Sequence, residues 1–363
     1  MIFAAFGNYD LAVRIKKALA QRGHEVKYFV HLSPQPQDFD SVKNFETVSF
    51  FELRHIHLKH KIDGIIVAGT DMPRATIEYF KVHDMPRLGF LHFSSNSSFS
   101  VQWISNEKGF LSYLETNLID SCNLNCKRCT HFAPLFDDSS FYNPNNFKND
   151  LRELSAKFDV LKFRLMGGEP FKLNNLADYL ELARFYFPDT DIRLVSNGLL
   201  IPSVSDSVLK AVKKYGIKVD VTLYPPTYKI REKLGEVFKA QGISYYFVSA
   251  GSTIIENFTY FLTLKGDKNP NEARKHCMND VCRFLRNGKL YKCAVDALSY
   301  KPAERFRTEA FPRAVGVDLY AANAVELARQ LDGNVELCHY CSESVKTAPW
   351  EVTNSPKLED WLA

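Results

Sequence analysis

The chain has 363 residues, of which 45% are hydrophobic and 24% are charged. At roughly 150 residues per domain, this length predicts two or three domains, and the composition excludes a disordered chain. The 46 basic and 42 acidic residues leave a net charge of +4, which is too small and too scattered to indicate a nucleic-acid partner.

The sequence of the first residues and the cysteine content indicate in which cellular compartment the protein is expected. No apolar run reaches the roughly 18 residues of a membrane span. The first residues, MIFAAFGNYDLAVRIKK, lack the basic stretch and apolar segment of a signal peptide. We therefore expect a cytoplasmic protein with no membrane partner. There, eight cysteines are more typical of metal or redox chemistry than of disulfides.

The first predicted domain, 1–110, alternates strand and helix patterns, which favours a parallel α/β sheet. Strands are expected at 1–6, 24–31, 62–67 and 87–92, and helices at 10–20 and 76–82. A dinucleotide-binding turn needs three glycines after the first strand, but FGNYD supplies only Gly7. A Rossmann-like domain used for docking or substrate contact is therefore favoured over an NAD-binding one.

The second predicted domain, 111–265, continues the alternation. Strands are expected at 113–120, 160–166, 192–195, 217–223 and 243–248, and helices at 147–158, 176–187, 208–215 and 230–238. Such repeats predict a partial (β/α)6 TIM-like barrel, whose chemistry lies at the carboxyl ends of the strands. SCNLNCKRCTHF, GGEP and SNG each follow a predicted strand, so we expect them on one face.

Three cysteines in that first segment form a C-x3-C-x2-C pattern, with thiols at Cys122, Cys126 and Cys129. Thiolates are the usual ligands of a [4Fe–4S] cluster. Three ligands leave one iron open, as a catalytic metal site does for its substrate. The alternative is a Cys3His zinc site completed by His131, but zinc would leave the GGEP unexplained.

CNLNCKRC followed by GGEP about 40 residues later resembles the radical S-adenosylmethionine (SAM) superfamily over roughly 113–250. The resemblance implies that the three cysteines hold a [4Fe–4S] cluster and that SAM binds the open iron. It implies contacts of Gly167, Gly168 and Glu169 with the SAM amino group, where a carboxylate suits an ammonium. Ser196 and Asn197 would contact SAM further along the rim, although Ser196-Asn197-Gly198 also fits an ordinary turn.

One position departs from the family pattern. Many members carry an aromatic residue just before the third cysteine, to pack on adenine, and Arg128 stands there instead. Phe132 or His131 could substitute, or Arg128 could stack by its guanidinium plane. Thr222 and Tyr224, after the next strand, are weaker candidates for the ribose.

The third predicted domain, 266–363, carries the other five cysteines, Cys277, Cys282, Cys293, Cys338 and Cys341. Asn287-Gly288 predicts a tight hairpin, and its register extended outward would place Cys282 opposite Cys293. A disulfide, a structural zinc site and a second Fe–S cluster all fit this pattern. The order C-x10-G-x4-C and then C-x2-C resembles the auxiliary-cluster domain of SPASM/twitch enzymes. The family spacing favours Cys277 as a ligand and the hairpin register favours Cys282.

The resemblance implies a radical SAM oxidoreductase that cleaves SAM reductively to a 5′-deoxyadenosyl radical and abstracts hydrogen from its substrate. An auxiliary cluster would favour net oxidation. We expect a small substrate of the sugar, aminocyclitol or nucleotide-sugar class, and an electron donor such as flavodoxin or ferredoxin. A peptide- or protein-modifying maturase is the first alternative, and a zinc-stabilised, non-enzymatic binding protein is the second. No catalytic acid or base stands out in the sequence.

Overall fold

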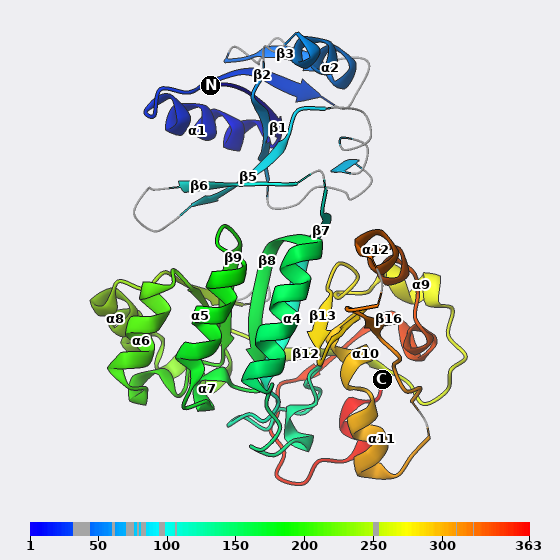
Figure 1. Ribbon diagram of the computed structural model, residues 1–363. Helices are drawn as coiled ribbons and strands as arrows, with labels where there is room; N and C mark the ends of the chain where they lie inside the picture. Colours follow the sequence, from blue (N-terminus) through cyan, green and yellow to red (C-terminus); the bar gives the residue numbers. More distant parts are fainter. Residues whose placement is uncertain are drawn as a thin grey trace. The chain divides into compact units, whose positions relative to one another are not determined.

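The computed structural model in Figure 1 describes residues 1–31, 44–59, 62–69, 76–77, 80, 85–93, 99–105, 107–249, 254–309, 311–321 and 323–363. The chain forms two compact units, Met1–Ser112 and Tyr113–Ala363. The second unit holds the residues of both the second and the third predicted domain, so the boundary at residue 265 stays a prediction. Within the described ranges, every helix is too short or too polar to cross a bilayer.

The first unit is built on a six-stranded sheet. Its elements are β1 (Ile2–Gly7), α1 (Tyr9–Ala20), β2 (Glu25–His31), β3 (Glu46–Ser49), α2 (Phe50–Leu58), β4 (Gly64–Ala68), β5 (Leu88–Phe93) and β6 (Phe99–Trp103). The strand order is β3-β2-β1-β4-β5-β6; all neighbours pair in parallel except β5 and β6. This order is that of a doubly wound fold, which confirms the Rossmann-like prediction. The helix expected at 76–82 lies largely outside the described residues.

Helix α1 covers the centre of this sheet because it carries a buried stripe of Ala12, Ile15 and Leu19. The Asn8 side chain caps the helix by accepting from the Leu11 N–H at 2.9 Å. The preceding turn needs Gly7, whose φ is +114° and whose added Cβ would lie 2.6 Å from the Ala68 carbonyl oxygen. The end of β1 therefore packs tightly on the end of β4.

The second unit begins with a repeated strand–helix pattern. Its elements are β7 (Gly109–Ile119), α4 (Pro144–Lys157), β8 (Phe158–Gly167), α5 (Leu176–Tyr186), β9 (Asp191–Ser196), α6 (Asp206–Lys214), β10 (Lys218–Thr222), α7 (Pro225–Lys229), α8 (Arg231–Gln241) and β11 (Tyr245–Val248). Strands β8 to β11 pair in parallel in chain order, and β7 lies beside β8. Figure 1 shows α4, α5, α6 and α8 along one side of this sheet. This is the parallel, helix-covered sheet expected of a partial barrel.

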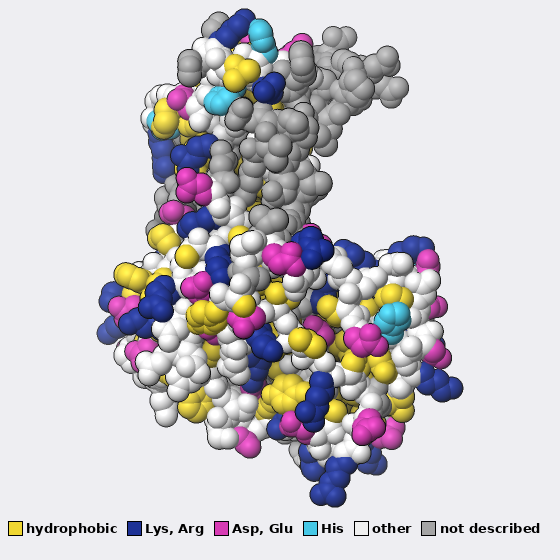
Figure 2. Space-filling view, turned by 45° about the vertical axis from the view of Figure 1, so that its right-hand side comes forward, with side chains coloured by type: hydrophobic (Ala, Val, Ile, Leu, Met, Phe, Trp, Pro, Cys, Tyr) yellow, Lys and Arg dark blue, Asp and Glu magenta, His cyan; other side chains and the backbone are white. Residues whose placement is uncertain are grey.

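The remaining elements complete the second unit. They are β12 (Asn257–Leu262), α9 (Pro270–Lys275), β13 (Phe284–Arg286), β14 (Lys289–Tyr291), α10 (Ala294–Leu298), α11 (Tyr300–Phe306), β15 (Val317–Asp318), α12 (Ala324–Asp332), the 3-10 turns η5 (Glu336–Tyr340) and η6 (Leu358–Trp361), and β16 (Cys341–Pro349). Strand β13 extends the barrel sheet by pairing with β7, while β12 and β16 form a separate antiparallel pair. Figure 2 shows basic and acidic side chains interspersed over the visible face of this unit.

The predicted hairpin is confirmed. Asn287 and Gly288 have φ angles of 46° and 73°, and Leu285 pairs with Leu290 as expected. The ladder ends at the pair Phe284 and Tyr291, so Cys282 and Cys293, two positions further out, are not cross-strand partners in it.

Candidate active site

The first three cysteines lie on the loop that follows β7. Two residues of this loop, Arg128 and Phe132, adopt the left-handed conformation, with φ angles of 62° and 51°. The chain therefore curls tightly. Cys126 is buried, and Cys122 and Cys129 are half-buried. The C-x3-C-x2-C spacing thus brings three thiols together below the surface.

The electrostatics of these thiols suit a metal cluster. Burial, followed by the nearby Glu169 carboxylate, raises the pKa of Cys122 to about 12. Burial and the neighbouring Cys129 raise the pKa of Cys126 to about 12, and burial raises the pKa of Cys129. Three crowded thiolates are therefore unfavourable unless a cationic centre compensates them, which iron would do.

Hydrogen-bond donors point at two of the sulfurs. Cys122 Sγ accepts from the Leu124 N–H at 3.3 Å and from Asn197 Nδ2 at 3.5 Å. Cys126 Sγ accepts from the Trp350 indole Nε1–H at 3.2 Å. Donors of this kind stabilise ligating thiolates, so the surroundings fit an Fe–S cluster.

His131, the fourth ligand of the zinc alternative, is held elsewhere. Its Nδ1 lies 2.8 Å from Asn117 Oδ1, and its ring lies edge-on to Phe284 with the centroids 6.1 Å apart. Burial lowers the pKa of His131. The His131 imidazole is therefore held in the protein interior by Asn117 and Phe284, which does not favour a zinc site with the three cysteines.

The two glycines of GGEP pack against β7. A Cβ on Gly167 would lie 1.9 Å from the Ile119 carbonyl oxygen, and one on Gly168 would lie 1.9 Å from the Ser121 carbonyl oxygen. The Gly168 N–H donates to Ile119 at 2.8 Å. Glycine is therefore required at these positions because the backbone of β8 lies against the end of β7, immediately before Cys122. The predicted contact with SAM stays a prediction.

Glu169 ties the end of β8 to the end of β9. Its fully buried carboxylate accepts from Ser196 Oγ at 2.8 and 3.0 Å, from the Asn197 N–H at 2.8 Å and from the Phe171 N–H at 3.1 Å. Burial raises its pKa to about 7, against the lowering effect of these donors. The carboxylate thus organises the Ser196-Asn197 turn, and its contact with the SAM ammonium stays a prediction.

Asn197 connects that turn to the cysteine loop. Its Nδ2 donates to Asn123 Oδ1 at 2.7 Å as well as to the Cys122 sulfur. The three segments expected on one face of the barrel therefore meet in one hydrogen-bonded network at the carboxyl ends of β7, β8 and β9.

The aromatic residues near the loop divide into two groups. Phe132, a predicted adenine contact, has no exposed surface and packs on Trp361 with the centroids 5.8 Å apart. An adenine contact by Phe132 would require its ring to leave this core. Tyr224 instead lies beside the thiols, and burial together with Cys126 raises its pKa. Its ring stacks on that of Trp350, with the ring centroids 5.9 Å apart and an angle of 24° between the ring planes.

Trp350 is a site residue that the sequence analysis missed. It follows β16, more than 200 residues after the cysteines, and no spacing rule connects it to them. The only signal in the sequence is a tryptophan in a short polar segment near the end of the chain, which does not by itself identify a site.

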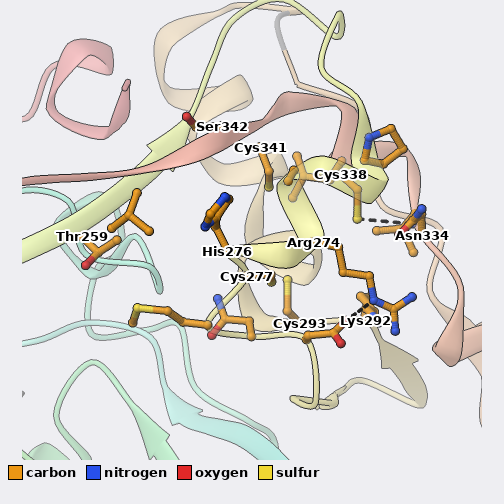
Figure 3. A pocket seen from close by; sticks show the side chains of 18 of the residues that line it. Thr259, Arg274, His276, Cys277, Lys292, Cys293, Asn334, Cys338, Cys341 and Ser342 are labelled. Carbon is orange, nitrogen blue, oxygen red and sulfur yellow. Dashed lines mark hydrogen bonds and ion pairs between the residues drawn. The ribbon is translucent and has the colours of Figure 1, made fainter.

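A second group of thiols lines a pocket shown in Figure 3. The pocket is open to solvent, and its walls include Cys277, Cys293, Cys338 and Cys341. Cys282 is not in its lining: this buried thiol lies 3.8 Å from Asn279 Oδ1.

The four pocket thiols influence one another. Burial and then Cys338 and Cys277 raise the pKa of Cys341 to about 12. Burial, Asp296 and Cys341 raise the pKa of Cys293. Nowhere in the described part of the chain do three His, Cys, Asp or Glu side chains converge on one metal ion. A four-iron cluster spreads its ligands around four metal atoms instead, and four thiols on the walls of one pocket are consistent with that demand.

Comparisons with known proteins give partial matches. No family model matches the chain. A GTP 3',8-cyclase of Sulfurovum sp. (strain NBC37-1) is 28% identical over 134 residues, 36% of this chain and 41% of that protein. One from Trichodesmium erythraeum is 30% identical over 125 residues, 33% of this chain and 38% of that protein. The chain thus spans about two fifths of the length of these relatives.

Partial matches to solved structures were also found. BtrN in complex with AdoMet and 2-DOIA matches with a TM-score of 0.40 and 16% identity, over 64% of this chain and 94% of BtrN. Streptococcus suis SuiB bound to S-adenosylmethionine matches with a TM-score of 0.32 and 18% identity, over 38% of this chain and 34% of SuiB. The similarity to the cyclases, which covers about a third of this chain, supports the resemblance to the radical SAM superfamily found in the sequence.

Proposed function

We propose that this protein is a radical SAM oxidoreductase acting on a small molecule, with one cluster for SAM and a second for electron transfer. The observation that carries the proposal is the network joining the cysteine loop to Glu169, Ser196 and Asn197. This network supports the proposal because the loop with three thiols lies beside a polar rim, and three thiolate ligands would leave one iron of a cluster open.

The first cluster would be held by Cys122, Cys126 and Cys129. When bound, a cluster with one open iron supplies the electron for reductive cleavage of SAM. The chain's own part is to hold the three thiols in one orientation and to shield them from water. Asn197 does the first by linking Cys122 to the rim, and the core around Phe132 supports the second.

The second cluster would be held by Cys277, Cys293, Cys338 and Cys341. Four thiols complete the ligation of a four-iron cluster, so no iron would remain open for substrate. Such a cluster suits electron acceptance, which supports a net oxidation. Lys292 and Arg274, which both bind Asp280, line the same pocket and would offset the negative charge of the ligands.

Two observations favour a small substrate over a peptide. The relatives with the matched sequence are named for GTP, which is a small molecule. The first unit is a doubly wound sheet, whereas peptide-modifying members often carry a winged helix for peptide recognition. We infer a sugar, aminocyclitol or nucleotide-sugar-like substrate and an electron donor of the flavodoxin or ferredoxin type.

The test is anaerobic reconstitution followed by metal analysis and a SAM-cleavage assay. We expect about eight irons per chain for two four-iron clusters, an EPR signal that changes on adding SAM, and formation of 5′-deoxyadenosine. Cys126→Ala should lose about four irons and all SAM cleavage, because its sulfur is one of only three ligands.

The alternatives give different results in the same experiment. Bound zinc without iron would support the binding-protein alternative and contradict the proposal. Consumption of a peptide, with no turnover of any phosphorylated or amino sugar, would support the maturase. SAM cleavage by Cys126→Ala at the wild-type rate would refute the assignment of the first cluster.

A further inference from the structure

The segment after β16 lies along the cysteine loop as an added strand. The Lys127 N–H donates to the Glu351 carbonyl at 2.9 Å, and the Thr353 N–H donates to the Asn125 carbonyl at 2.8 Å. Cys126 and Val352 are paired as an isolated antiparallel bridge. The central cysteine of the motif is therefore fixed by backbone from the far end of the chain.

Side chains reinforce this contact. Lys127 Nζ lies 2.9 Å from Glu351 Oε2, and Arg128 donates to the Pro349 carbonyl at 3.2 Å. The Trp361 indole donates to the Cys129 carbonyl at 2.9 Å. We call residues 349–361 the C-terminal clasp. It contacts both the backbone and the charged side chains of the loop.

One clasp residue reaches a ligand sulfur directly. The Trp350 Nε1–H donates to Cys126 Sγ at 3.2 Å. Its ring stacks on Tyr224, and its backbone N–H donates to the Glu256 carbonyl at 2.8 Å. The indole is thus oriented by its ring and by its backbone, so the direction of the N–H is fixed before any cluster binds.

A hydrogen bond to a ligating sulfur changes the redox properties of a cluster. Reduction adds negative charge that spreads onto the sulfurs, and a donor there stabilises the reduced state more than the oxidised one. The reduction potential of the cluster therefore rises. Partners outside the ligand shell are an established way to tune metal sites.

We propose that Trp350 is a positioning residue that raises the reduction potential of the SAM-binding cluster through its N–H···S bond to Cys126. This inference rests on the proposed function, because it requires the first cluster. It assigns to the C-terminal clasp a part in making the cluster easier to reduce.

The test is a redox titration of the reconstituted protein, monitored by EPR and following the signal that changes on adding SAM. Trp350→Phe keeps an aromatic ring on Tyr224 but removes the N–H, and we expect the midpoint potential to become more negative. Trp361→Phe is the matched control, since that indole donates to a carbonyl oxygen instead of a sulfur, and we expect a smaller shift.

A second variant separates the N–H from the shape of the ring. Benzothienylalanine at position 350, in which sulfur replaces the indole N–H, should reproduce the negative shift of Trp350→Phe. It keeps the ring size if the phenylalanine variant fails to fold.

The inference is wrong if the benzothienylalanine protein has the wild-type potential, or if Trp361→Phe shifts it as far as Trp350→Phe. A wild-type protein that binds iron but shows no SAM-sensitive signal would overturn the proposed function and this inference together. A SAM-sensitive signal whose midpoint potential is the same with and without the Trp350 N–H would overturn the inference but leave the proposed function standing.

Discussion

The two groups of cysteines are assembled in opposite ways. The first three lie within eight residues of one loop, between Cys122 and Cys129. The four that line the pocket come from separate elements: the turn after α9, the start of α10, η5 and the start of β16. The first group is encoded by spacing, whereas the second exists only once the chain has folded.

Their sulfurs are also held differently. In the first group, the local Leu124 N–H is joined by donors from distant segments, Asn197 and Trp350. In the pocket, Cys293 Sγ accepts from the Asp296 N–H at 3.4 Å at the beginning of α10, and Cys338 Sγ accepts from the Val335 N–H at 3.4 Å. Local turns thus orient Cys293 and Cys338, whereas Cys122 and Cys126 are also held by the tertiary structure.

The largest difference is expected between removing a cysteine that lines the pocket and removing one that does not. Cys293→Ala should lose about four irons per chain and product formation, while SAM is still cleaved at the first cluster. Cys282→Ala is the matched control, since this thiol lies outside the pocket and should retain all iron. Iron and sulfide analysis with chromatography of 5′-deoxyadenosine measures both.

Iron loss in Cys282→Ala but not in Cys293→Ala would contradict the assignment of the pocket cysteines. Equal iron loss in both variants would mean that the substitutions disturb the fold around the hairpin and do not remove a ligand.

Part of the site could be predicted from the sequence. The C-x3-C-x2-C loop, GGEP and Ser196-Asn197 could be placed on one face because each follows a strand of a parallel repeat, and such strands end at the same edge. The choice between Cys277 and Cys282 could not be made, because the hairpin ladder stops at Phe284, before the extrapolated pair.

Other contacts could not be predicted at all. Trp350 reaches Cys126 across more than 200 residues by tertiary packing alone. Phe132 is a candidate for adenine from its position after the third cysteine, but its ring packs in a buried core cluster in the folded chain.

A smaller effect is expected where the two regions are tied together. Arg286, at the tip of β13, makes two parallel hydrogen bonds of 2.8 and 2.6 Å to the buried carboxylate of Asp120, two residues before Cys122. Asp120→Asn leaves the guanidinium half-paired in a buried site, which costs about 3–5 kcal/mol of unfolding free energy. Urea unfolding followed by circular dichroism measures the loss.

An exposed pair provides the control. Glu326 and Arg329 interact at 2.8 Å on the surface of α12. Glu326→Gln should leave the urea midpoint unchanged, because solvent screens such a pair. A midpoint for Asp120→Asn equal to that of wild type would show that the two regions are not coupled through Arg286.

The smallest predicted effect uses one buried carboxyl group from each region. Burial raises the pKa of Glu169 from 4.5 to about 7 and that of Asp296 from 3.8 to about 6. A pKa raised in the folded state gives stability that is complete below the unfolded pKa and is lost as pH rises through the folded one. Each group is half ionised at its folded pKa, so the loss ends about one pH unit above it, at about pH 7 for Asp296 and about pH 8 for Glu169, and at 1.36 kcal/mol per pKa unit it totals about 3 kcal/mol for each group.

The two windows separate the groups experimentally. Between about pH 7 and 8, Glu169→Gln should flatten the pH dependence of the thermal midpoint measured without SAM, whereas Asp296→Asn should leave it nearly as in the wild-type protein, because Asp296 is almost fully ionised there. Below about pH 6 both variants should flatten the curve. If Asp296→Asn alone flattened it above about pH 7, then the buried proton would reside in the pocket region. The Glu169 carboxylate would then be charged throughout, sustained by its four hydrogen bonds to the ends of β8 and β9.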